Sequence, residues 1–390
     1  MKKKLFTFLL ILLLIEIFLR IFKPSALDFY WVQKQAHRLD KDYLVDLEPN
    51  MKERIVHFQG FFDMNFSTNE FGFRATDPIN NSIPQIACIG DSVTMGFGVN
   101  DEDTFCRKLN GFTSKDNIKY QSINMAVDAY GPSAISLKLK KYIPNLNVKL
   151  LYYFPSNGDD IDEKNFYNKM NNPNSLLLFK TQFLLTKYSY LVLGIRITQE
   201  QFVYRFNETF IYPLQKMVHT KKCLDRILPE DECENTYFPY KHFSIIEEFT
   251  RPNKKTDDVT HFAQRECMDT PEDFTMPDSM IKALDEIIQF TKEKNIKLVI
   301  VTTPLDLETA YCSQNKKFHR FYSYQDKLKV FLKERGIDHL DLNRYTYKMT
   351  DSKGRMNVRP YYILGDGHYT KLGNQWVADH LLKKTKKILD

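Results

Sequence analysis

The fold is decided by a short stretch, IACIGDS at residues 86–92. Its four apolar residues predict a buried strand, and the glycine and aspartate that follow predict a tight turn. Ser92 then lies just past the carboxyl end of the strand, where open α/β sheets build their sites. The stretch therefore predicts an α/β fold with Ser92 as a candidate nucleophile.

A second group of polar residues lies near the C-terminus, where DGH at residues 366–368 precedes YTKLG and an apolar-periodic helix. Taken singly, these residues have ordinary alternatives: Ser92 as a helix N-cap, Asp366 as a turn former and His368 as a half-buried loop residue. Taken together, they supply a nucleophile, a base and an orienting carboxylate. We therefore predict a catalytic triad of Ser92, His368 and Asp366.

The pairing of an early Gly-Asp-Ser with a late Asp-x-His resembles the SGNH/GDSL hydrolase family. Three further stretches, NEFGFR at 69–74, GDSVTMGFGV at 90–99 and DEDTF at 101–105, resemble the membrane-anchored bacterial branch of that family. The resemblance covers most of the chain outside a central insertion. It implies hydrolysis of carboxylic esters through an acyl-serine intermediate, with no cofactor.

The resemblance also implies an oxyanion hole, formed by the backbone N–H of Ser92 and donors from two further blocks. The second block of the family carries a glycine where SINMAVDAYG at 122–131 has Ala129, and Gly131 follows two residues later. A backbone N–H can donate from either residue. We therefore expect Ala129 or Gly131 to contribute one donor.

The third block departs further from the family pattern, because Asp159 stands where an asparagine side-chain donor is expected. An ionised carboxylate cannot donate a hydrogen bond. Either Asn157 reaches the oxyanion through a shifted loop, or Asp159 occupies the position and the hole lacks one donor. Loss of one such donor costs about two to three orders of magnitude in turnover.

The rest of the chain alternates between strand and helix patterns, which predicts a doubly wound, flavodoxin-like α/β fold with a five-stranded parallel sheet. Five segments are rich in Ile, Val, Leu or Tyr and are predicted strands: 85–89, 120–124, 149–154, 297–302 and 338–342. Three segments are predicted helices: 277–294, 322–335 and 371–389.

We divide the chain into four parts: a membrane anchor at 1–24, a linking extension at 25–83, a hydrolase domain at 84–159 and 276–390, and an inserted cap at 160–275. Within the extension, Arg74 is expected to have a structural role and to pair with a carboxylate. The cap carries many aromatic and basic residues, which suit either packing within the cap or contacts to a sugar chain or lipid headgroup.

The N-terminus combines three lysines with an apolar run that continues to Phe22, giving about 18 residues, enough to span a membrane. The lysines favour a cytoplasmic N-terminus, so the remaining chain would be extracytoplasmic. A cleaved signal peptide is the alternative, but no A-x-A site follows the run. Glu16 and Arg20 are four residues apart and can pair on one helix face.

The composition excludes few other classes. A net charge of +6, spread along the chain, argues against a nucleic-acid-binding protein. Six cysteines fit a non-cytosolic location; we expect Cys88 to be a small buried apolar residue and consider a bridge between Cys223 and Cys233. Since no His/Cys cluster has zinc spacing, we predict no metal site.

These observations predict a serine esterase anchored in the membrane, acting on small acyl groups of envelope polysaccharide or on a lipid ester. An O-acyltransferase would use the same residues, with a sugar hydroxyl in place of water. A polysaccharide-binding module with reduced activity is the alternative from another class, and Asp159 favours it. The sequence does not predict an oligomeric state.

Overall fold

The computed structural model describes residues 2–156, 159–206, 267–271, 274–319, 323–363 and 366–390, with Phe210, Leu214, Met217, Lys221, Lys222 and Asp225. The chain divides into two compact units. The first draws on residues 1–34 and 182–258, and the second on residues 35–181 and 259–390.

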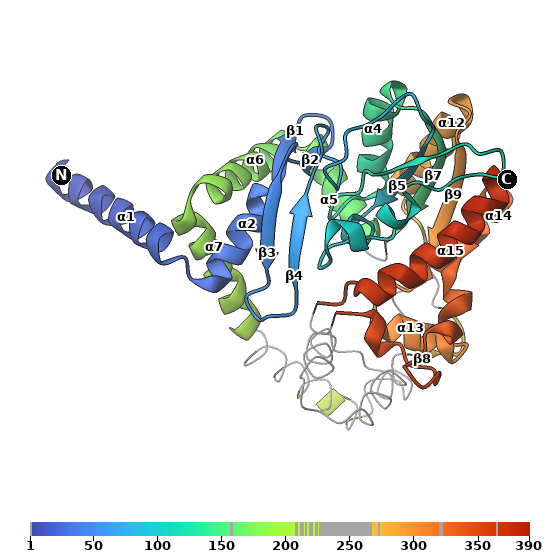
Figure 1. Cartoon of the computed structure of the whole chain (residues 1–390). Helices are drawn as coiled ribbons and strands as arrows, with labels where there is room; N and C mark the ends of the chain where they lie inside the picture. Colours follow the sequence, from blue (N-terminus) through green and yellow to red (C-terminus); the bar gives the residue numbers. More distant parts are fainter. Residues whose placement is uncertain are drawn as a thin grey trace. The chain divides into compact units, whose positions relative to one another are not determined.

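The second unit is built on a five-stranded parallel sheet (Figure 1). Its strands are β5 (Gln85–Gly90), β6 (Gln121–Asn124), β7 (Val148–Phe154), β9 (Lys297–Thr302) and β11 (Asp338–Asp341). The spatial order is β11-β9-β7-β5-β6. Counted along the chain, this is the 2-1-3-4-5 order of flavodoxin-like folds. The five predicted strands are confirmed, each to within one residue at its ends.

The central strands are apolar because both of their faces are covered. All residues of β5 are buried, and in β7 only Lys149 is exposed. Continuous apolar runs of this kind are typical of parallel strands with helices on both sides. The strand order reverses at β5, because β6 is added on one side of it and β7 on the other, and at such a point these sheets open a crevice at their carboxyl edge.

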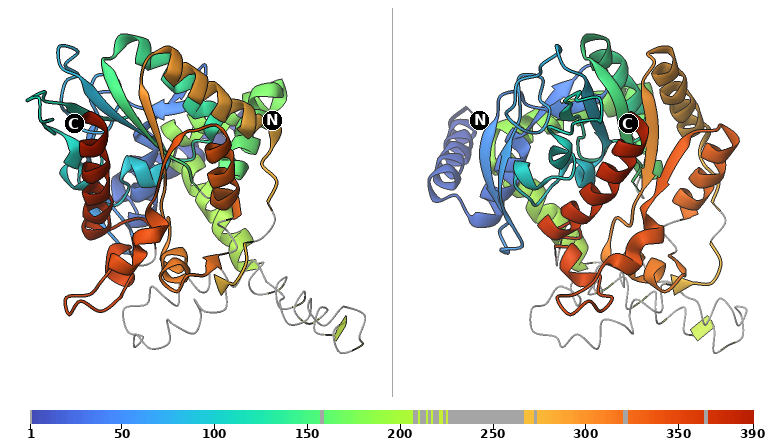
Figure 2. Two further views of the ribbon diagram at one scale, coloured as in Figure 1. Left: turned by 90° about the vertical axis from the view of Figure 1, so that its right-hand side faces the viewer. Right: turned by 45° about the vertical axis from the view of Figure 1, so that its right-hand side comes forward.

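Helices cover both faces of the sheet. They are α3 (Ser92–Met95), α4 (Pro132–Tyr142), α5 (Asp159–Asn171), α12 (Asp278–Glu293), α13 (Leu307–Gln314), α14 (Ser323–Glu334) and α15 (Lys371–Leu389). Neighbouring residues of a strand point to opposite faces. The Tyr152 hydroxyl meets Thr385 of α15, whereas the Tyr153 hydroxyl donates to Asp159 of α5. Figure 2 shows α15 in dark red on one side of the sheet and α4 with α12 on the other. The predicted helices at 277–294, 322–335 and 371–389 are confirmed.

Short antiparallel hairpins precede the sheet. They pair β1 (His37–Asp40) with β2 (Leu44–Leu47) and β3 (Lys52–Val56) with β4 (Asp63–Ser67). A further pair joins β8 (Cys267–Met268) to β10 (Phe318–His319). After β4, the fully buried Arg74 donates to Asp101 at 2.5 Å and to the carbonyls of Met95, Gly96 and Val99. The predicted pairing of Arg74 with a carboxylate is confirmed, and it fixes the loop after α3.

The first unit contains α1 (Lys2–Phe22), α2 (Ser25–Gln35) and α7 (Tyr190–Phe206), while α6 (Pro173–Tyr188) contributes its last residues. Leu27 of α2 packs against Tyr190 and Leu193 of α7. Helix α1 has a mean hydropathy of 2.6 over its most apolar window, and none of its described residues is buried. It is long and apolar enough to span a membrane.

Two disulfides join described residues, Cys88 to Cys106 and Cys267 to Cys312. The prediction for Cys88 was wrong in one respect: the side chain is buried, but it is bonded. The apolar surroundings of β5 predicted the burial, whereas the return of the chain past β5 at Cys106 depends on tertiary structure. The bridge considered between Cys223 and Cys233 lies outside the described residues.

The segment predicted as a cap, residues 160–275, is divided between the two compact units. Helix α5 and most of α6 belong to the unit that contains the sheet, and α7 belongs to the unit that contains α1. Residues 226–266 lie outside the described part of the chain. A cap formed by residues 160–275 therefore stays a prediction.

Candidate active site

The turn after β5 places Ser92 at the start of α3. The Asp91 side chain is the N-cap of this helix and accepts a hydrogen bond from the backbone N–H of Val93 at 2.9 Å. The cap is therefore Asp91, so Ser92 is not needed as one. Its hydroxyl is left available for another partner.

Gly90 is required by the close approach of neighbouring groups at the end of β5. A Cβ atom at this position would lie 2.4 Å from the Thr94 hydroxyl oxygen and 2.6 Å from the carbonyl oxygen of Phe154 on β7. Both distances are shorter than a carbon atom tolerates, and the second involves fixed backbone. The glycine before Asp91 therefore lets the turn pack against the neighbouring strand.

The structure brings the three predicted triad residues together in a chain of hydrogen bonds. Ser92 Oγ lies 2.8 Å from Nε2 of His368. The other ring nitrogen, Nδ1, is hydrogen-bonded to Oδ1 of Asp366. The side chains of His368 and Asp366 are 20% and 15% exposed, so the group is largely shielded yet reachable.

The pKa values of the two partners shift in the directions expected for a charged pair. Burial alone would raise the pKa of Asp366, but the hydrogen bond and charge of His368 lower it overall. Burial alone would lower the pKa of His368, but the hydrogen bond and charge of Asp366, with the charges of Asp91 and Asp128, raise it overall. The site therefore holds an imidazole made more basic by surrounding carboxylates.

Sequence reasoning missed several acidic groups around the triad. Burial and the charges of Asp91 and Asp128 raise the pKa of Asp162, in the first turns of α5, to about 6. Asp128 also meets His37 Nε2 at 2.5 Å. The run Asp159-Asp160-x-Asp162 was visible in the sequence, but its proximity to Ser92 depends on how α5 returns to the sheet.

Ala129 lies in the loop after β6, which runs beside the nucleophile turn, since Val127 N–H donates to the Gly90 carbonyl at 3.3 Å. Ala129 is exposed and has a φ of +56°, a left-handed conformation that favours glycine. Gly131 has another use: a Cβ there would lie 2.7 Å from the backbone nitrogen of Glu163, so this residue allows α4 to approach α5. Ala129 and Gly131 both stay candidate donors.

The structure places Asp159 in a buried network rather than at an open donor position. Its side chain accepts hydrogen bonds from the Tyr153 and Tyr324 hydroxyls, at 3.1 and 3.2 Å, and from Ser156 N–H at 2.9 Å. Burial, with the nearby charge of Asp91, raises the pKa of Asp159 well above its usual range. Both carboxyl oxygens accept hydrogen bonds in this network, and the raised pKa favours the neutral carboxyl, which also carries one donor. Asn157, the other candidate, lies outside the described residues.

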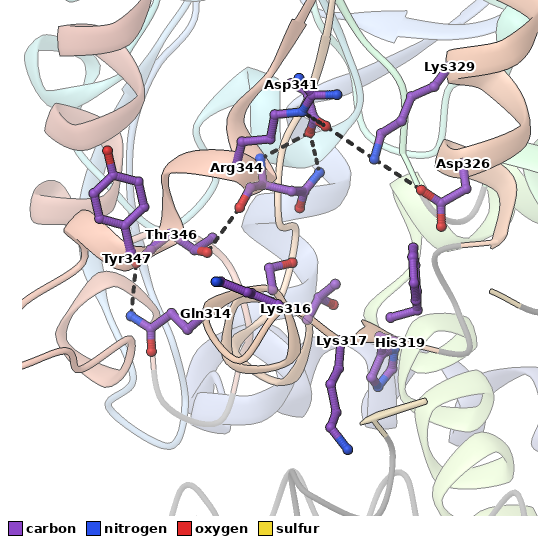
Figure 3. Close-up of a pocket in the computed structure, with 14 residues that line it drawn as sticks. Gln314, Lys316, Lys317, His319, Asp326, Lys329, Asp341, Arg344, Thr346 and Tyr347 are labelled. Atoms are coloured by element: carbon purple, nitrogen blue, oxygen red, sulfur yellow. Dashed lines mark hydrogen bonds and ion pairs between the residues drawn. The ribbon is translucent and has the colours of Figure 1, made fainter. Parts of the chain in front are cut away.

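A separate polar pocket of about 480 Å³ lies among α13, α14 and the segment after β11 (Figure 3). Its described lining does not include the triad. Lys329 points between Asp326 and Asp341, at 3.0 and 3.2 Å, and Arg344 also pairs with Asp341. These four charges compensate one another, whereas Lys316 and Lys317 add positive charge to the lining. Among the described residues, no group of three or more His, Cys, Asp or Glu side chains is arranged to hold a metal ion.

Comparison with known proteins adds little beyond the architecture. No protein-family model and no curated protein matches the sequence. Among solved structures, the chain is similar to a protein from Desulfitobacterium hafniense DCB-2, provisionally assigned as a lipolytic protein of the G-D-S-L family, with a TM-score of 0.35 and 10% identity over 78% of this chain and 99% of that one. It is also similar to a provisionally assigned acylhydrolase from Bacteroides fragilis NCTC 9343, with a TM-score of 0.35 and 11% identity over 80% and 92%. Likeness at this level does not bear on activity.

Proposed function

We propose that the chain is a serine esterase that hydrolyses carboxylic ester bonds through an acyl-Ser92 intermediate. The observation that carries the proposal is the 2.8 Å contact between Ser92 Oγ and His368 Nε2, with Asp366 on the other ring nitrogen. A nucleophile, a base and an orienting carboxylate in this order are the arrangement that activates a serine hydroxyl.

In the acylation step, Ser92 Oγ attacks the ester carbonyl carbon while His368 Nε2 accepts the hydroxyl proton. Asp366 holds the ring with Nδ1 protonated and stabilises the imidazolium that forms. The imidazolium then donates its proton to the leaving alkoxide, so the alcohol departs and the acyl group stays on Ser92.

Deacylation repeats these steps with water. His368 accepts a proton from water as its oxygen attacks the acyl carbon, and it returns that proton to Ser92 Oγ as the acid leaves. The negative oxygen that develops in each step needs hydrogen-bond donors. We assign the Ser92 and Ala129 backbone N–H groups to this role. Asp159 is instead engaged with Tyr153, Tyr324 and Ser156 in the buried network.

We further propose that α1 anchors the protein in a membrane with the lysines on the cytoplasmic side, as a single-pass anchor. The two disulfides support an oxidising, extracytoplasmic location for the remaining chain. The substrate we propose is an envelope polysaccharide bearing small acyl groups. Carboxylates surround the triad, and this favours a neutral acyl group such as acetyl over an anionic one.

Covalent labelling tests the proposed nucleophile. The full chain, in detergent micelles, is treated with a fluorophosphonate probe alongside Ser92→Ala, His368→Ala and a control, Ser352→Ala, which removes an exposed serine in a turn. We expect labelling of the native chain and of the control only. A folded native chain that takes no label, or a Ser92→Ala variant that still does, contradicts the proposal.

The fate of the acyl group separates hydrolysis from transfer. Incubation of the protein with an acetylated oligosaccharide, plus an unacetylated one as acceptor, is followed by mass spectrometry. We expect free acetate and no gain of acetyl on the acceptor. Acetyl groups on the acceptor would instead identify an O-acyltransferase that uses the same three residues.

A further inference from the structure

The first unit carries an apolar groove of about 700 Å³ between α7 and the junction of α1 with α2. Only Thr198 and Gln199 contribute polar side chains to its described lining. The side of α1 and α2 contributes Leu19, Pro24, Ala26 and Leu27. An open apolar surface of this kind is uncommon on a soluble protein and marks a site of interaction.

The wall formed by α7 is an exposed apolar helix face. Leu191, Ile195, Phe202 and Phe206 recur at helical spacing and therefore share one side of α7. Ile195 and Phe202 are 58% and 67% exposed. The opposite side of α7 is already used, because Leu193 and Tyr190 pack against Leu27 of α2. Helix α7 is thus apolar on both sides: the Leu193 side packs against α2, while on the other side Ile195 and Phe202 are exposed and Phe206 contacts the Phe210 ring at 5.3 Å.

Polar contacts hold the start of α7 against the last turns of α1. Glu16 accepts hydrogen bonds from the backbone N–H groups of Tyr190 and Leu191 at 3.0 and 2.8 Å. Arg20 donates to Glu16 at 2.7 Å and to the carbonyl of Tyr188 at 2.7 Å. The two charged side chains in the apolar helix therefore serve the α6–α7 connection, and the groove begins where the chain leaves α1.

An aromatic and basic cluster lies beside the contact between α1 and the start of α7. The Trp31 ring stacks on Tyr190 with centroids 4.1 Å apart, and the Arg20 guanidinium lies over both rings at 5.2 and 5.5 Å. Trp and Tyr gather where a membrane protein crosses from hydrocarbon to water. The cluster therefore marks the interface at the end of the α1 span.

We propose that α2 and α7 lie in the interfacial region of the leaflet at which α1 ends, and that lipid acyl chains fill the groove between them. The proposal rests on the proposed membrane anchor and adds a second contact with the same bilayer. Continuity supports it, because Leu19 of α1 lines the groove together with Ile195 and Phe202 of α7. A helix that lies in the plane of the interface buries its apolar face at the boundary between headgroups and acyl chains.

Fluorescence quenching by brominated lipids tests this placement. The full chain is reconstituted into phospholipid nanodiscs with bromine on the acyl chains, after its two native tryptophans are replaced by Trp31→Phe and Trp376→Phe. Single probes are then introduced as Phe202→Trp and, on the same face, Ile195→Trp. The matched control is Arg196→Trp, on the charged side of α7 where Arg196 pairs with Glu200 at 2.9 Å. A fourth probe, Leu10→Trp, reports on α1.

We expect brominated lipid to quench Phe202→Trp and Ile195→Trp several-fold more than Arg196→Trp, and to quench Leu10→Trp as well. If Leu10→Trp is quenched but both α7 probes respond no more than the control, the anchor stands and this inference is overturned; a second copy or another protein then covers the groove. If Leu10→Trp is also unquenched, the proposed membrane anchor is refuted, and the inference that rests on it is refuted with it. Circular dichroism of each variant checks that the chain is folded, and the second α7 probe replaces the first if one variant is not.

Discussion

The Asp366→Asn substitution removes the carboxylate that orients His368 and leaves the shape of the site almost unchanged. In the structure, Asp366 Oδ1 is hydrogen-bonded to Nδ1 of His368, while Nε2 faces Ser92 Oγ at 2.8 Å. An amide at position 366 can present its N–H₂ to the ring instead. The ring would then carry its proton on Nε2, where it cannot accept the proton of Ser92.

The expected loss of activity is large. Disruption of the tautomer in an otherwise intact triad lowers turnover by about 10⁴-fold, which at about 1.4 kcal/mol per tenfold is about 5 kcal/mol of transition-state stabilisation. The pH profile shifts as well. The hydrogen bond and charge of Asp366 raise the pKa of His368 against the effect of burial. Since neutral His368 is the active form, a raised pKa places the acid limb at higher pH, and removing the carboxylate moves that limb to lower pH.

The rate of fluorophosphonate labelling measures both effects without knowledge of the substrate. Labelling rates of the native chain and Asp366→Asn are compared between pH 5 and about pH 9, a range that brackets the ordinary pKa of histidine. Asp379→Asn, an exposed carboxylate on α15 that accepts from Gln375, is the matched control. If Asp366→Asn labels at the native rate with the native acid limb, Asp366 does not orient the base and the mechanism proposed here is incorrect.

Three further substitutions test the surrounding scaffold. In Gly90→Ala the new methyl lies 2.6 Å from a backbone carbonyl oxygen of β7, so we expect a loss of about 1–3 kcal/mol, seen as a lower melting temperature; an unchanged melt contradicts the close approach. Lys138 and Asp46 form a fully buried pair at 2.6 Å, so Lys138→Met costs about 3–5 kcal/mol in denaturant titrations, and adding Asp46→Asn restores part of it. Burial alone would raise the pKa of Asp46, but Lys138 lowers it overall. The stability that this pair contributes is therefore fully present above the usual carboxyl pKa, and it is lost as the pH falls through the lowered pKa. Replacing Cys88 and Cys106 together by alanine opens a loop with a sequence separation of 18 and costs about 3 kcal/mol; equal melting with and without the bridge contradicts this.

The sheet was predictable chiefly from its central strands β5, β7 and β9, which are short apolar runs. All residues of β5 are buried, so no polar side chain interrupts its apolar run to face solvent. The hairpins β1–β2 and β3–β4 were not predicted, since their exposed and buried residues do not alternate over a long enough stretch. Their formation depends on packing against the rest of the unit.

The triad was predictable because its residues flank recognisable elements, and the electrostatic surroundings were not. Asp128 contributes to the raised pKa of His368, and Asp91 to the raised pKa of Asp162, only because the β6–α4 loop and α5 return to the same edge of the sheet. Asp159 illustrates the same point. Its position in the chain suggested a place at the oxyanion hole, whereas its hydrogen-bond partners Tyr153 and Tyr324 are far apart in sequence and meet only in the folded chain.

The carboxylates near Ser92 affect both the base and the substrate. Burial lowers the pKa of His368, but Asp366, with smaller contributions from Asp91 and Asp128, raises it overall, so the ring is a stronger base. Asp162, with a pKa of about 6, is mostly ionised at pH 7 and adds a further negative charge. An anionic ester would meet these charges before it reached the nucleophile, whereas a neutral acetyl ester would not. The same groups that make the imidazole more basic would therefore also repel an anionic ester, and this is the physical basis for the neutral acyl group that we propose.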